Sequence, residues 1–158
     1  MFSRFSIQTR LSTVEAEAIL GRLVRPRAGW FDLGHQTSDT RPFVGRIEHG
    51  SFKFSRVITG RNSFLPIVIG RVMQAEGGAV VRGHMRMALV VIVFMTFWIG
   101  MALSAAIHEV PRRLHAHDLP SAFLVACFPL LGAVLVGFGY YPERRKALRM
   151  LTEAFQPK

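Results

Sequence analysis

The chain has 158 residues, of which 20 are lysine or arginine and 10 are aspartate or glutamate, so its formal charge is +10 with neutral histidines. This length is too short for two large domains, and a single cysteine, Cys127, excludes a disulfide framework within one chain. Half of the residues are hydrophobic and gather mainly in two uncharged runs, so we attribute the basic charge to membrane topology or anionic lipid and expect no nucleic-acid partner.

The N-terminal segment predicts a strand followed by a helix. Ser3–Thr9 alternates between apolar and polar residues, as a short strand does. Ser12 and Glu15 then have the spacing of a capping box, in which a hydroxyl caps the helix and a carboxylate three residues later reaches back. The predicted helix runs from Thr13 to about Val24, and Pro26 ends it.

The loop that follows, residues 26–42, contains Trp30, which is unusually apolar for a loop. In one interpretation this loop folds back onto the sheet as a lid over its core. In the other it dips into the membrane or binds a partner, because tryptophan favours the membrane interface. Under the second interpretation Trp30 is a membrane-interface anchor.

Four strand-like segments complete the N-terminal region, namely Phe43–Glu48, Ser51–Thr59, Ile67–Ala75 and Ala79–Arg86. Glycine supplies the positive φ that tight turns need, and Gly77 and Gly78 stand between the last two strands. We therefore predict an α+β cytoplasmic domain over residues 1–86, with the element order strand, helix and four-strand antiparallel meander. The strands form one sheet, and the helix packs on one face of it. The last strand alternates between an apolar and a basic face, and it enters the next apolar run without a linker.

The motifs of this region carry a resemblance. They are F-V-G-x-I at residues 43–47, F-x-F-x-R-x-I at 52–58, R-N-S-F-L-P-x-x-x-G at 61–70 and the glycine pair at 77–78, with an apolar helix after them. This pattern resembles a group of bacterial two-transmembrane-helix membrane proteins that have a small N-terminal cytoplasmic β-rich domain and no assigned activity. The resemblance covers roughly the middle third of the chain, and it implies no site residues.

Two uncharged runs, Met87–Ile107 and Ser121–Tyr141, hold 21 residues each. About 20 apolar residues cross a bilayer core of about 30 Å, so we predict a transmembrane helical hairpin over residues 87–141 with a loop at 108–120. Basic residues flank the outer ends of the hairpin and only two lie in its loop, which predicts an inner (plasma) membrane protein with both termini cytoplasmic. Tyr140 and Tyr141 then lie at the cytoplasmic interface as aromatic anchors. Neither run contains an aspartate, glutamate, lysine, arginine or histidine, which argues against a transporter acting alone.

Two features bear on packing. Small residues stand four apart in each run, at Gly100 and Ser104 and at Ala133 and Gly137, which favours close contact within the hairpin or between copies. Residues 142–158 predict a short, separate, basic amphipathic helix that begins at Pro142. This helix suits the anionic inner leaflet and the surface of the cytoplasmic domain equally well.

Two sets of residues are candidate binding sites. The first is basic and suits an anion or a lipid headgroup, because guanidinium groups bind phosphate through paired hydrogen bonds. It comprises Arg71, Arg82, Arg86, Arg144, Arg145 and Lys146, with Arg46, Arg56 and Arg61 as further arginines of the sheet. The second is a candidate metal site in the loop, formed by His108, His115 and His117. Arg112 stands where the H-E-x-x-H zinc motif needs its second histidine, so a polar connector is the alternative interpretation.

Three functions are compatible with these features, and no catalytic residue or cofactor is expected. The first is a non-enzymatic integral membrane protein whose cytoplasmic domain binds a protein partner or anionic lipid headgroups, with the hairpin as an anchor or as a contact in a homo-oligomer. The second is a ligand-sensing or transport accessory subunit with an apolar cavity under Trp30. The third is a metal-dependent membrane enzyme built on the histidine loop.

Overall fold

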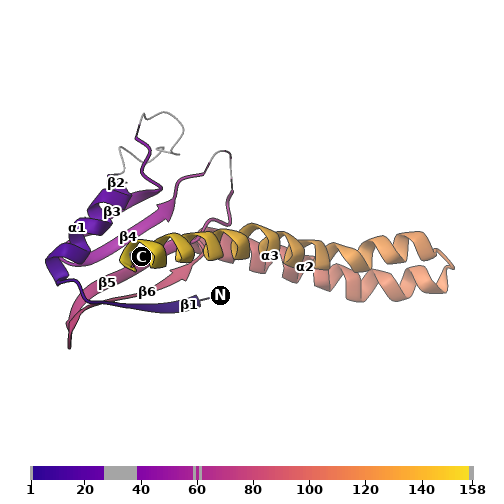
Figure 1. The fold of residues 1–158 in the computed structure, drawn as a ribbon. Coiled ribbons are helices and arrows are strands. Elements are labelled where there is room, and N and C mark those ends of the chain that lie inside the picture. The colour runs from indigo at the N-terminus through magenta and orange to yellow at the C-terminus, as the bar shows by residue number, and fades with distance from the viewer. Residues whose placement is uncertain (1, 27–38, 59, 61, 157–158) are drawn as a thin grey trace.

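The computed structural model describes residues 2–26, 39–58, 60 and 62–156. A sheet domain lies at one end, and two long helices extend from it side by side (Figure 1). The elements in chain order are β1 (Phe2–Thr9), α1 (Thr13–Leu23), β2 (Val24–Pro26), β3 (Phe43–Glu48), β4 (Ser51–Arg56), β5 (Ile67–Ala75), β6 (Gly78–Arg86), α2 (Leu89–His115) and α3 (Leu119–Phe155).

The strands form one six-stranded sheet in the order β1-β6-β5-β4-β3-β2. Its centre is the predicted antiparallel meander, because β3, β4, β5 and β6 are successive neighbours. β1 pairs antiparallel with β6 at one edge, and β2 pairs parallel with β3 at the other. The predicted antiparallel meander is therefore confirmed, and the sheet is mixed because the unpredicted strand β2 adds a parallel pair. The three residues of β2 are too few to show a strand period.

α1 begins at the predicted capping box. The Glu15 amide donates to Ser12 Oγ at 3.3 Å, and the Ser12 amide donates to Glu15 Oε2 at 2.8 Å. The Ser12 amide and the Ser12 hydroxyl, which also donates to Glu15 Oε2 at 2.8 Å, together lower the pKa of the Glu15 carboxyl. Ala16 and Leu20, one turn apart, are fully buried in the core of the sheet domain. The cap thus fixes where the helix starts, and the apolar pair fixes which side faces the sheet.

α3 is one helix of 37 residues that belongs to both parts of the protein. Its first half packs beside α2, and its last turns lie over the sheet (Figure 1). Ala147, Leu151 and Phe155 are only 1–2 % exposed and belong to the same core as α1 and the strands. The predicted separate C-terminal helix is therefore wrong, because α3 continues through Pro142. Burial of three apolar side chains offsets the roughly 3 kcal/mol that an internal proline costs a helix.

The same burial decides between the two predicted positions of the tail. Its apolar side faces the sheet of its own domain, so that side is covered by protein and does not lie on a leaflet. The sheet domain therefore has two layers, in which α1 and the end of α3 cover one face of the sheet. Among the described residues no helix packs on the other face, which we call the open face.

α2 and α3 form the predicted hairpin, and both extend into the predicted loop. α2 continues to His115 and α3 starts at Leu119, so the connection shrinks to residues 116–118. Glu109 forms ion pairs with Arg112 and Arg113, one turn later, and these pairs support the additional helical turn despite Pro111.

The contact between the two helices uses other residues than the predicted small pairs. The Trp98 ring of α2 lies 4.9 Å from that of Phe128 and covers Gly132, where a Cβ atom would collide with the indole. A Cβ atom added at Gly100 or Gly137 would meet no atom within 4 Å. The predicted small pairs therefore do not mediate the contact inside the hairpin.

Both helices of the hairpin are long and apolar enough to cross a membrane, judged by length and composition. In the most apolar 18-residue window of each helix, only 11% and 17% of the residues are buried. The hairpin therefore exposes a large apolar surface, unlike the core helix of a soluble protein.

The domain and the hairpin are joined by polar contacts near the middle of α3. Tyr140 is 2 % exposed, and its hydroxyl donates to the Met85 carbonyl of β6 at 3.1 Å. The side-chain amide of Asn62, in the connection between β4 and β5, donates to the Gly139 carbonyl at 2.9 Å. Pro142 has no amide hydrogen to donate to the Phe138 carbonyl, four residues earlier, so the helical ladder is interrupted next to Gly139. The Asn62 contact thus supports the helix where its own hydrogen bonding is weakest.

Candidate anion-binding site

The two faces of the sheet differ in chemistry. The helix-covered face carries the buried residues of the strands, such as Phe52, Val68 and Val81. Residues one position away along each strand point to the open face. In β6 these are Val80, Arg82, His84 and Arg86, as the predicted alternation requires.

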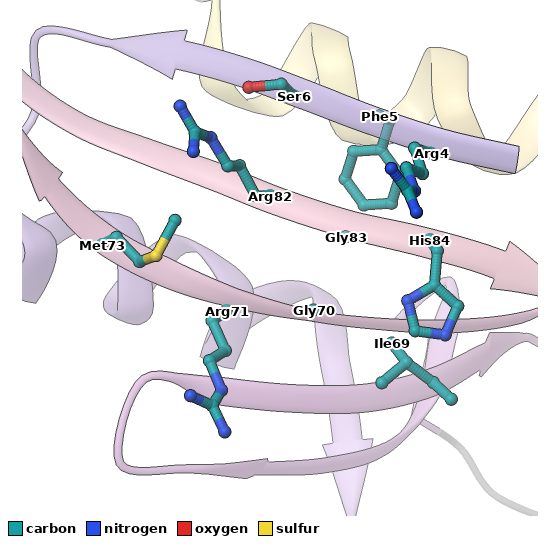
Figure 2. A pocket seen from close by; sticks show the side chains of 10 residues that line it. All are labelled: Arg4, Phe5, Ser6, Ile69, Gly70, Arg71, Met73, Arg82, Gly83 and His84. Carbon is teal, nitrogen blue, oxygen red and sulfur yellow. The ribbon is translucent and has the colours of Figure 1, made fainter.

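A broad cavity of about 670 Å³ lies on the open face across β1, β6 and β5 (Figure 2). Strand pairing places Arg4 opposite His84 and His84 opposite Ile69, which makes one border of the cavity. The other border is the row of Ser6, Arg82 and Arg71. Phe5, Gly83 and Gly70 pair across the strands between these rows, and their backbone forms the floor. We call this cavity the arginine trough.

Positive charge is concentrated in the arginine trough. Arg71 and Arg82 are directly opposite residues of neighbouring antiparallel strands, and Arg4 lies on the next strand. Like charges in directly opposite positions destabilise a sheet. Among the residues that the structure describes, the cavity lining contains no aspartate or glutamate, and none of the ion pairs involves these three arginines.

The side chains are arranged as this repulsion requires. Arg82 extends toward β1, on which Ser6 lies, whereas Arg71 extends away from Arg82 (Figure 2). The two guanidinium groups are therefore separated along this border of the cavity. An anion placed between them would neutralise both.

The structure divides the six predicted cations into two groups. Arg71 and Arg82 lie in the arginine trough, together with Arg4. The other four lie where the domain meets the hairpin: Arg86 ends β6, and Arg144, Arg145 and Lys146 follow the second apolar run on α3. The predicted set is thus two separate clusters at different distances from the hairpin.

The further arginines of the predicted sheet face are not part of the arginine trough. Arg56 points to the helix-covered side, where its Nε donates to Glu143 of α3 at 2.7 Å. Arg46 forms an exposed ion pair with Glu48 at 3.2 Å. Arg61 lies outside the described residues.

The three predicted metal-ligating histidines occupy the tip of the hairpin. His108 and His115 lie on α2, and His115 Nδ1 contacts the Pro111 carbonyl at 2.7 Å. His117 lies in the connection with a φ of 58°. In the part of the chain that the structure describes, no three histidine, cysteine, aspartate or glutamate side chains are grouped to hold a metal ion. The metal site therefore stays a prediction without support from this arrangement.

The predicted membrane-interface anchors differ from one another. Tyr141 is 43 % exposed, as an anchor requires, whereas Tyr140 packs into the junction between domain and hairpin. This burial argues against an anchor role for Tyr140. Trp30 lies outside the described residues, so both interpretations of its loop stay open as predictions.

Arg4 is the site residue that the sequence did not indicate. It lies on a predicted strand, but a strand pattern does not identify the neighbouring strand. The pairing of β1 with β6, residues 2–9 with residues 79–86, brings Arg4 beside His84. The alternation of Arg4 and Ser6 with Phe5 and Ile7 was the available signal, because it gives β1 the same basic and apolar faces as β6.

Comparisons with known proteins find no matching family model, no matching curated protein and no matching solved structure. The coarse part of the predicted resemblance is confirmed, since an N-terminal sheet domain precedes two long apolar helices. The particular bacterial group stays a prediction.

Proposed function

We propose that this protein is a non-enzymatic, membrane-anchored binding protein of the bacterial inner membrane. Its hairpin spans the bilayer, and its sheet domain lies in the cytoplasm directly below. The observation that carries this proposal is the exposed apolar surface of the hairpin, on which Val90, Phe97 and Phe138 are 73%, 70% and 79% exposed. Such a surface is unfavourable in water and favourable in lipid.

The dimensions of the hairpin support this placement. The segment of α2 from Leu89 to Ile107 is about 28 Å long at 1.5 Å per residue, close to the roughly 30 Å of a bilayer core. The charged and polar residues of α2, from His108 to His115, follow directly and form a polar tip. In this placement the polar tip lies in water on the side of the bilayer opposite the sheet domain.

The cations at the junction suit an anionic leaflet. Arg144, Arg145 and Lys146 come within five residues of Tyr141, where α3 would leave the membrane. A lysine or arginine close to an anionic surface contributes about 1 kcal/mol of binding free energy. These residues would hold the domain close to the inner leaflet and contact its headgroups.

The chemistry of the open face favours binding over catalysis. Three of the four ionisable side chains in the arginine trough are arginines. A guanidinium group donates hydrogen bonds and stays protonated near neutral pH, so it serves anion recognition better than general acid–base catalysis.

Cysteine labelling tests the anchor. Cys127 is the only native cysteine, so the labelling variants are made in a chain that carries Cys127→Ser. In intact spheroplasts, a membrane-impermeant maleimide should label Ala116→Cys at the tip and should label Glu76→Cys, in the β5–β6 turn, only after permeabilisation. Labelling of Glu76→Cys in intact cells, or release of the chain by alkaline carbonate, would contradict the proposal.

Reconstitution tests the headgroup contact. In nanodiscs that contain phosphatidylglycerol, the domain should unfold at a higher temperature than in phosphatidylcholine nanodiscs. The Arg144→Gln/Arg145→Gln/Lys146→Gln variant should lose this difference. Arg149→Gln, one turn farther along α3, should keep it as the matched control. Equal unfolding temperatures of the wild-type domain in the two lipids would exclude the headgroup contact.

A further inference from the structure

The position of the arginine trough relative to the hairpin limits what can reach it. The strands run roughly along α3, away from the hairpin (Figure 1). Arg86 lies three residues before α2 begins, and Arg82 lies four residues before Arg86. At about 3.3 Å per strand residue, the row of Arg82 and Arg71 is about 13 Å farther from the hairpin than Arg86.

This distance exceeds the thickness of a headgroup layer. The headgroup region adds about 5–7 Å to each side of the bilayer core. The field of a charged surface decays within a Debye length of about 8 Å at physiological salt. With Arg86 at the membrane surface, the paired arginines of the arginine trough would therefore lie in water, beyond contact with lipid phosphates.

The composition of the arginine trough indicates a multiply charged anion. Arg4, Arg71 and Arg82 supply three positive charges, and no carboxylate lines the cavity within the described residues. A carboxylate brings one negative charge, whereas a phosphate monoester or diphosphate brings about two or more at neutral pH. Guanidinium groups also match phosphate oxygens through paired hydrogen bonds.

The remaining walls suit an organic group. Ile69 and Met73 line the cavity beside the arginines (Figure 2). The cavity volume, about 670 Å³, is far larger than one phosphate needs and falls within the range of small-molecule sites, about 300–1,000 Å³. An apolar side beside a cationic side matches a small organic molecule that carries phosphate.

We propose that the arginine trough binds a water-soluble organic phosphate or diphosphate. The phosphate lies between Arg82 and Arg71, with Arg4 as the third cation, and draws the two separated guanidinium groups toward each other. The organic part lies against Ile69 and Met73. This inference rests on the proposed cytoplasmic placement of the domain, but its test does not depend on that placement.

The test measures binding of pyrophosphate to the full chain in phosphatidylcholine nanodiscs, by calorimetry and by the shift in thermal unfolding. Pyrophosphate should bind and raise the unfolding temperature above that in sodium chloride of equal ionic strength. Arg71→Gln/Arg82→Gln should weaken binding about tenfold per arginine, as expected for lost charge-assisted hydrogen bonds. The matched control, Arg22→Gln/Arg46→Gln, removes the same charge outside the arginine trough and should bind like the wild type.

A second readout separates lost binding from lost folding. Without pyrophosphate, Arg71→Gln/Arg82→Gln should be at least as stable as the wild type, because it removes a directly opposed pair of like charges. A stable variant that keeps the wild-type affinity would overturn the proposal. So would a wild type that gains no more stability from pyrophosphate than from sodium chloride.

A separate measurement tests whether the bound phosphate belongs to a lipid headgroup. Without pyrophosphate, the change from phosphatidylcholine to phosphatidylglycerol nanodiscs should shift the unfolding temperature of the wild type and of Arg71→Gln/Arg82→Gln equally. If this lipid stabilises the wild type alone and pyrophosphate does not bind, the ligand is a headgroup and the proposal of a soluble phosphate is wrong. Failure of cysteine labelling at the hairpin tip would instead reject the membrane placement and leave the pyrophosphate result intact.

Discussion

The continuity of α3 makes a sharp prediction at Leu151. Its side chain is 1 % exposed and lies in the core of the sheet domain, more than 30 residues after the start of the hairpin helix. Leu151→Ala should destabilise the sheet domain, because it removes buried apolar contacts and leaves a cavity. Buried leucine-to-alanine changes cost about 2–5 kcal/mol. A domain is stable by about 5–15 kcal/mol, so this loss is a large fraction of the total.

Hydrogen exchange is the suitable assay, since it reports on the strands while the hairpin stays in lipid. For a loss of about 3 kcal/mol, exchange of the protected amides in β5 and β6 should become about a hundredfold faster in nanodiscs. Leu131→Ala is the matched control, because it makes the same chemical change on the same helix at a position that is 48 % exposed. It should leave the exchange of β5 and β6 unchanged.

The result that refutes this reasoning is equally definite. If α3 ended at Pro142 and its tail lay on the leaflet, Leu151→Ala would act like an exposed substitution. The free energy of unfolding derived from the exchange of β5 and β6 would then stay within about 0.5 kcal/mol of the wild-type value, as it does for most surface substitutions. That outcome would remove the tail from the core of the domain.

Three further predictions concern other parts of the fold. Gly132→Ala should push the two helices of the hairpin apart and cost about 1–3 kcal/mol, because the new methyl group meets the Trp98 indole of α2. In Gly137→Ala the methyl group meets no atom, so this variant should stabilise α3 slightly. Unfolding of the two variants in detergent measures the difference in their stability. Arg56→Gln should destabilise the junction by about 1–3 kcal/mol, because it removes the closer of two cations from Glu143, which is 13 % exposed, and leaves Lys146 at 3.5 Å. Adding Glu143→Gln should recover part of this loss in a double-mutant cycle. The Arg41 guanidinium lowers the pKa of the Asp39 carboxyl to about 2 from an ordinary 3.8. The stability that this ion pair contributes is therefore complete above about pH 4 and is lost as the pH falls toward 2. Asp39→Asn should flatten this part of an acid-unfolding curve, and an unchanged curve would exclude the ion pair as the cause of the pH dependence.

Local patterns were sufficient for most of the elements. The capping box set the start of α1, and Phe43–Glu48 and Ile67–Ala75 were predicted with their observed bounds. Such signals act over a few residues, so a single sequence displays them. Helix ends were less predictable, because Pro111 and Pro142 are signals for a break that the folded protein overrides.

The candidate site was predicted only in part. Arg71 and Arg82 were among the predicted anion-binding residues, but the face of Arg71, its position directly opposite Arg82 and the presence of Arg4 beside them depend on strand pairing. Arg56 and Glu143 are 87 residues apart in the chain, so no local pattern assigns Arg56 to the helix-covered face. Pairing across such separations depends on which faces bury together, and the residue pattern of one strand does not contain this information.

The sequence by itself determined the uncharged lengths of the two long helices, the turn glycines and the alternation of the last strand, because each depends on residues close together in the chain. Only the tertiary structure decided that α3 passes from the hairpin into the core of the sheet domain. That outcome depends on apolar area buried between Leu151, Phe155 and strands that lie more than 60 residues earlier in the sequence. The free energy of this burial outweighs the cost of Pro142 to the helix. The hairpin and the sheet domain, which the sequence presents as separate, therefore share the helix α3.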